Sequence, residues 1–328
     1  MRRATHGRAR TVMQLPALLL AAALAGCAAS PAPGPGSSGA ATAQRPEALS
    51  LLGRPLFRPA LQREARERLQ ADLARARAAY EANPRDADAI TWLGRRLAYL
   101  GEYRAAIDVF TEGVEKHPND ARMYRHRGHR FITTRQLSRA IADLERAAEL
   151  VRDRPDEVEP DGAPNRYNIP VSTLQTNIWY HLALAHYLRH DFEAALPAWR
   201  RALELSTNDD MIVAAADWLY MTLRRLGRTE EAAQLLDRIS PTMRILENDA
   251  YHRRLLMYKG MVVPDSLLRA GTGDAVQVAT YGYGVANWHL YNGDRHAAET
   301  LFRRILEGPN WAAFGFIAAE AELAGGGR

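Results

Sequence analysis

Cysteine and lysine are both scarce in this chain of 328 residues. Cys27 is the single cysteine, so no disulfide can form within the chain. Lysine occurs only at positions 116 and 259, and nearly all other cations are arginine. The formal net charge is +5, and four arginines precede residue 11, which leaves +1 for the rest of the chain. This small excess gives no reason to expect a nucleic acid as partner.

The motifs of the common catalytic and cofactor sites are also missing. Nothing resembles a nucleophile elbow, a P-loop or a zincin motif. Gly271-Thr272-Gly273 follows a helical pattern rather than a strand, which excludes a dinucleotide loop. His126 and His129 share a helix face, but arginines surround them and no acidic ligand is near. We therefore predict no catalytic residue, no cofactor and no metal site; a catalytic pair drawn from separate helices stays open.

Long apolar runs are absent as well, since the run from Leu15 to Leu24 is too short to span a bilayer comfortably. It follows an arginine-rich start, which is typical of a secretory signal. Leu24-Ala25-Gly26-Cys27 then resembles a bacterial lipobox. That resemblance implies a lipoprotein signal peptide over 1–26 and a lipid on Cys27. Ala28 in place of Asp favours the outer membrane of a diderm cell, facing the periplasm; an ordinary signal peptide is the alternative.

Small residues and proline dominate the next stretch, so residues 27–48 are expected to form a lipidated, disordered tether. Leu49–Leu61 contains two prolines and is expected to be extended and packed on the first helices. Pro59–Tyr80 has apolar residues along one helical stripe, which predicts a single helix.

A period of 34 residues organises the chain that follows. Gly94 recurs as Gly128, and Phe110 recurs as Leu144. Glycine at one fixed position lets two helix axes approach, and the large apolar residue fills the space beside it. Pro118 ends the second helix of the first unit because proline lacks the N–H that a helix needs.

This period and these residues resemble the tetratricopeptide repeat (TPR). The resemblance implies an all-α fold, a right-handed solenoid of helical hairpins over residues 49–324. We place five repeats at about 87–120, 121–153, 176–209, 213–243 and 279–308. A degenerate hairpin is expected at 247–271 and a cap helix at 311–323. The proline-rich acidic stretch 153–172 interrupts the register and predicts a surface loop.

In TPR proteins, set positions of each first helix line a concave surface that binds protein or peptide. Carrying these positions over predicts a groove rich in arginine and tyrosine and poor in acids, which favours an acidic peptide. Arginine abundance and tyrosine packing are the alternative explanation. The groove residues that we select are Arg95, Tyr99, Arg122, Arg125, His129, Tyr180, Tyr187, Arg224, Arg225, Tyr283 and Tyr291.

The acidic stretch allows two interpretations. It either folds over the groove and imitates an acidic ligand, or it is a solvated loop. For the whole chain we expect a membrane-anchored scaffold in the cell envelope that binds a protein or peptide. Two alternatives stay open: an envelope enzyme or its regulatory subunit, and a structural homo-oligomer held by Trp311 and Phe314.

Overall fold

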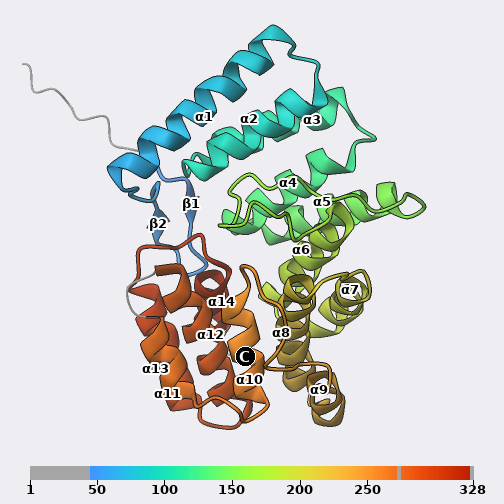
Figure 1. Ribbon diagram of the computed structural model, residues 1–328. Helices are drawn as coiled ribbons and strands as arrows, with labels where there is room; N and C mark the ends of the chain where they lie inside the picture. The colour runs from blue at the N-terminus through green and yellow to red at the C-terminus, as the bar shows by residue number, and fades with distance from the viewer. Residues whose placement is uncertain (1–44, 272–274, 326–328) are drawn as a thin grey trace, which may run out of the picture. The chain divides into compact units, whose positions relative to one another are not determined.

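The computed structural model describes residues 45–271 and 275–325, which are almost entirely helical (Figure 1). Cys27, the predicted signal peptide and the tether up to residue 44 lie outside the described residues. The elements, in chain order, are β1 (Ala48–Leu49), β2 (Pro55–Leu56), α1 (Arg63–Ala82), α2 (Ala87–Tyr99), α3 (Tyr103–Lys116), α4 (Ala121–Thr133), α5 (Leu137–Val151), α6 (Leu174–Leu188), α7 (Phe192–Glu204), α8 (Asp209–Arg225), α9 (Thr229–Leu236), α10 (Asp249–Tyr258), α11 (Pro264–Ala270), α12 (Ala275–Tyr291), α13 (Arg295–Leu306) and α14 (Phe314–Gly325).

Neighbouring helices pack as hairpins, and successive hairpins pack on each other through α3 and α4, α5 and α6, and α7 and α8. The repeated glycines, Gly94 and Gly128, lie where the two helices of one hairpin contact each other. A Cβ on Gly94 would lie 2.4 Å from Cζ of Phe110, and one on Gly128 would lie 2.8 Å from Cγ of Leu144. The prediction of an all-α, TPR-type array of hairpins is therefore confirmed.

The starts and turns of the hairpins also follow the 34-residue period. Asp86 and Asp120 cap α2 and α4, because each carboxylate accepts a hydrogen bond from a backbone N–H of the first turn. The turn after α2 contains Gly101 with φ +77°, whereas the turn after α4 contains Arg135 with φ +62°. A left-handed arginine costs roughly 1–2 kcal/mol, so the contacts of its side chain must offset that cost.

The segment before α1 forms a short antiparallel hairpin, in which Ala48 pairs with Leu56. We predicted an extended stretch here, and the two strands agree with it. The predicted helix start at Pro59 is wrong, since α1 begins at Arg63. Pro59 instead packs against the turn of the first repeat, where a Cβ on Gly101 would lie 2.7 Å from the proline Cδ.

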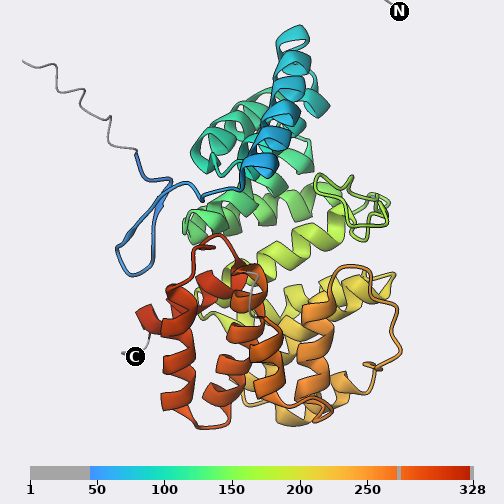
Figure 2. The same cartoon turned by 60° about the vertical axis from the view of Figure 1, so that its left-hand side comes forward.

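The C-terminal helix α14 contacts this N-terminal hairpin (Figure 1; Figure 2). The indole of Trp311 donates to the Phe57 carbonyl oxygen at 2.7 Å. The backbone N–H of Leu51 donates to Glu320 at 3.2 Å. Trp311 is 6% exposed and its ring contacts Tyr103 edge-on. The predicted cap helix thus packs on the first repeat as well as on α12 and α13.

Two buried acids hold the irregular hairpin of α10 and α11 against α8. Asp210 accepts from three consecutive backbone N–H groups, those of residues 246–248. Asp217 pairs with Arg254 of α10 at 2.9 Å, with both side chains at most 1% exposed. Burial raises the pKa of Asp217 to about 7. The α10 helix is therefore fixed relative to α8 by polar contacts as well as by packing.

The main hydrophobic core runs from Leu56 to Ala319. Residues 45–328 thus contain the whole of this core, and a fragment with these limits is expected to fold without the preceding residues. No helix in the described part is long and apolar enough to cross a membrane.

Candidate functional site

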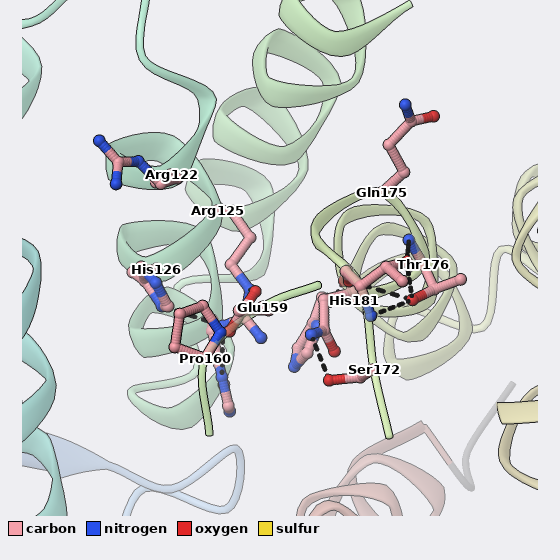
Figure 3. Close-up of polar contacts among 12 residues, drawn as sticks. Arg122, Arg125, His126, Glu159, Pro160, Ser172, Gln175, Thr176 and His181 are labelled. Carbon is pink, nitrogen blue, oxygen red and sulfur yellow. Dashed lines mark hydrogen bonds and ion pairs between the residues drawn. The ribbon is translucent and has the colours of Figure 1, made fainter. Parts of the chain in front are cut away.

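The acidic segment, defined as residues 153–172, lies across the first helices of repeats one and two. Glu159 places a carboxylate oxygen 2.9 Å from Nε of Arg125. The Pro160 carbonyl oxygen accepts from Arg95 at 2.8 Å. Figure 3 shows Glu159 and Pro160 against Arg125. Of the two interpretations of this segment, the one in which it folds over the predicted groove describes the structure.

The segment continues along α2 beyond Pro160. Arg96 donates to the Gly162 carbonyl oxygen at 2.8 Å. Tyr99 lies so close that a Cβ on Gly162 would come within 2.2 Å of the phenol oxygen. The segment closes on itself, because Val158 forms an antiparallel backbone bridge with Thr173 at the start of α6. A stretch of the protein's own chain therefore covers the part of α2 and α4 where the groove was predicted.

The contact between Arg125 and Glu159 is buried but imperfect. The N–H of Arg125 Nε is not aligned with the carboxylate for a hydrogen bond, although the atoms are 2.9 Å apart. The other end of the guanidinium contacts Nδ1 of His126 at 3.1 Å. Burial, then the charge of Arg125, lowers the pKa of His126 well below its usual value. This histidine is accordingly neutral and accepts the arginine N–H.

A second histidine pair continues the surface toward repeat three. The rings of His129 and His181 lie 4.3 Å apart, and both contact Phe314 of α14. Burial is the main cause of the low pKa of both histidines, each well below the ordinary value. They form a neutral aromatic floor between α4, α6 and α14.

A cavity of about 230 Å³ opens beyond this floor, over α6, α8 and α10. Tyr180, Tyr251 and Phe314 provide its aromatic walls, and Asn177 and Asn248 provide amide groups. The Tyr180 hydroxyl donates to the Tyr251 hydroxyl at 3.2 Å. Cavities with apolar walls and a few polar groups are suited to side chains of a bound partner.

The structure separates Arg122 from the other predicted groove residues of repeat two. Arg122 pairs with Asp120 at 2.6 Å and with Asp88 at 2.5 Å. These contacts lie at the end of the hairpins, and in Figure 3 Arg122 points away from Arg125. The charge of Arg122 is therefore already balanced within the chain.

Two predicted groove tyrosines are in the core. Tyr187 is 1% exposed and Tyr283 is not exposed, and their hydroxyls lie 2.8 Å apart. The expectation that they line an open groove is wrong for this structure, because α6 and α12 meet at this point. Arg225 is enclosed beside them and pairs with Glu322 of α14. Arg224 contacts Tyr291 of α12, with the guanidinium carbon 4.3 Å from the ring centre.

Several residues of the surface escaped prediction. Arg96 and Arg130 directly follow the predicted positions Arg95 and His129 in the sequence, and this adjacency was the only signal for them. Tyr251 and Phe314 come from the irregular hairpin and the cap, where the repeat register gives no signal. Among the described residues there is no group of three or more side chains that could hold a metal ion.

Comparison with known proteins finds one family model, "Tetratricopeptide repeat", which matches residues 176–209. No curated protein matches. A tetratricopeptide repeat protein from Parabacteroides merdae is 16% identical, with TM-score 0.44, over 79% of this chain and 99% of that one. YrrB, described as "a TPR protein with an unusual peptide-binding site", is 18% identical, with TM-score 0.40, over 71% and 91%.

The matched residues include α6 and α7, and the hairpins before and after them pack in the same manner. The repeated close contacts at Gly94 and Gly128 have the 34-residue spacing of this family. Residues 176–209 thus match the tetratricopeptide repeat family, and the hairpins before and after them have the same TPR-type fold.

Proposed function

We propose that this protein is a lipid-anchored scaffold of the cell envelope that binds an extended, acidic segment of a partner protein on its concave face. TPR folds serve as protein-interaction scaffolds, and the single observation that supports this finer proposal is the protein's own acidic segment. It lies extended on α2 and α4, with one carboxylate at Arg125 and two carbonyl oxygens at Arg95 and Arg96. A partner segment with the same groups would use the same donors.

Arginine suits this role because its planar fork holds carboxylate and carbonyl oxygens with defined geometry. The acidic segment is tethered at both ends, so its effective concentration at the site is high, of millimolar order for short flexible links. A partner must therefore bind more tightly than the free segment would, or gain further contacts. The aromatic cavity at Tyr180 and Tyr251 lies on the same face and offers such contacts.

The anchor and the location rest on Cys27 and its lipobox. Several acyl chains would hold the protein stably, since each buried CH₂ contributes about 0.8 kcal/mol. The scaffold would then face the periplasm from the outer membrane.

Site-specific photo-crosslinking in cells tests the binding face. A photoreactive amino acid at Tyr251 would line the cavity, whereas one at Arg146, on α5, would be exposed away from it. We expect a discrete adduct with one protein from position 251 and none from position 146. Equal labelling from the two positions, or no adduct from position 251, would argue against the proposal.

The other functions considered gain no support from a particular contact. Trp311 is buried against Tyr103, and its indole is hydrogen-bonded to the Phe57 carbonyl oxygen. The residue expected to mediate self-association therefore makes its contacts within the chain. Phe314 likewise packs on His129 and His181.

A further inference from the structure

Beneath the acidic segment lies a small cavity with an excess of positive charge. It has a volume of about 100 Å³, and its lining includes Arg95, Arg125 and Arg130. Glu159 is the one carboxylate in this lining. The nearby histidines, His126 and His129, are neutral and therefore contribute no charge to the cavity. Three cations therefore face one anion.

Arg130 is the cation whose partner is missing. Its guanidinium carbon lies 5.6 Å from the ring centre of Tyr103, and no described residue accepts a hydrogen bond from it. Burial lowers the pKa of Arg130 to about 10. Arg130 is half-buried, and its five N–H donors are available to an acceptor that enters the cavity. Such a side chain marks a place for an anion.

Arg125 can donate a hydrogen bond to the same anion. Its ion pair with Glu159 is not aligned as a hydrogen bond, although the residue is buried. A cavity of about 100 Å³ has room for an oxyanion with water molecules, because one water needs about 10–15 Å³ on this measure.

We propose that this cavity is an oxyanion site, in which a carboxylate or phosphate group binds between Arg125 and Arg130 and competes with Glu159. The carboxylate of an acidic side chain and a free phosphate ion share this chemistry. That the natural source is a partner's side chain rests on the function proposed above, whereas the site itself does not.

The free-anion test uses the fragment of residues 45–328 and inorganic phosphate at pH 8, against chloride at equal ionic strength. We expect phosphate to raise the melting temperature. In Glu159→Gln the half-maximal shift should need about tenfold less phosphate, because a competing charged contact is removed. In Arg130→Gln the shift should be lost. Glu157→Gln, which changes an exposed acid of the same segment, should behave like the unaltered fragment.

Arg130→Gln removes a cation that has no partner, so the variant should melt no lower than the unaltered fragment without phosphate. This separates loss of binding from loss of folding. If phosphate and chloride act alike in the unaltered fragment and in Glu159→Gln, or if Arg130→Gln keeps the phosphate shift, the oxyanion site does not exist.

A second arm separates this site from the proposed function. The probe is a labelled peptide with the sequence of residues 156–164, and its binding is measured by fluorescence anisotropy with Glu159→Gln. Phosphate binding without peptide binding would support the oxyanion site and overturn the peptide-binding function. Peptide binding that Arg130→Gln leaves unchanged would support that function and overturn the site. Peptide binding weakened about tenfold by Arg130→Gln would support both.

Discussion

Arg135 and Glu320 lie 185 residues apart and form a two-point ion pair, with Nε and one terminal nitrogen of the arginine each 3.0 Å from a carboxylate oxygen. The side chains are 3% and 1% exposed. The same arginine donates to the Trp311 carbonyl oxygen at 2.7 Å. The pair thus joins the turn of repeat two to the cap helix. It explains why an arginine occupies a left-handed turn position where the first repeat has glycine.

Glu320→Gln should destabilise the fragment of residues 45–328 strongly. The change leaves a buried guanidinium without its counter-ion, which typically costs about 3–5 kcal/mol. Urea denaturation followed by circular dichroism measures the free energy of unfolding. Arg146→Gln is the matched control, because the pair Arg146–Glu149 is exposed and should contribute about 0–1 kcal/mol. Equal effects of the two substitutions would show that the cap is not fixed by this pair.

The stability of the fragment should fall as the pH drops from 7 to 5. The pKa values of His126, His129 and His181 are well below the usual 6.5 in the folded protein. The unfolded chain therefore binds their protons first, and stability that is present above pH 6.5 is lost below it. Each such proton changes the free energy of unfolding by up to about 1.4 kcal/mol per pH unit.

Asp217 acts in the opposite direction over the same range. Its pKa is about 7 in the folded protein and about 3.8 in the unfolded chain, so its contribution is complete below 3.8 and declines as the pH rises to 7. Burial also raises the pKa of Glu247, and it lowers the pKa of His186 and His190. Five histidines thus outnumber two acids, so the net slope stays positive. Melting temperatures at several pH values provide the test, and His126→Gln should reduce the slope. A melting temperature that rises from pH 7 to pH 5 would contradict the assignment of neutral histidines.

Gly94→Ala should destabilise the protein although alanine is the better helix former by about 1 kcal/mol. The added Cβ would meet the Phe110 ring at 2.4 Å, and overpacking of this kind typically costs about 1–3 kcal/mol. Phe110→Leu in the same chain should recover part of the loss. Gly113→Ala is the comparison, because its Cβ meets the flexible thioether of Met123. If Gly94→Ala raised the melting temperature, the close helix contact would be absent.

Lipid attachment at Cys27 predicts that metabolic labelling with a fatty acid marks the protein in a diderm host. Cys27→Ser should abolish the label and release the protein from the outer-membrane fraction. The sequence has no other cysteine to take the lipid. Labelling that persists in the serine variant would place the lipid elsewhere and remove the basis for the anchor.

The hairpins could be predicted from the sequence, because the positions of Gly94 and Phe110 recur with one period and each repeat contacts its neighbours. It was not sufficient for contacts between distant repeats. Tyr187 and Tyr283 occupy positions that face inward in each repeat taken alone, but α6 and α12 meet and bury them. The pair of Arg135 and Glu320 is similar, since no local pattern links a turn to a helix 185 residues later.

We propose that the first helices of the array bind an extended acidic peptide. The most direct test is a titration of a synthetic peptide of residues 154–168 into a variant of the fragment of residues 45–328. In this variant, residues 154–168 are replaced by a Gly/Ser linker of equal length. We expect saturable one-to-one binding by calorimetry, weakened about tenfold when the peptide has Gln in place of Glu159. The intact fragment should bind the same peptide much more weakly. Absence of binding, or equal binding to the two fragments, would contradict the account.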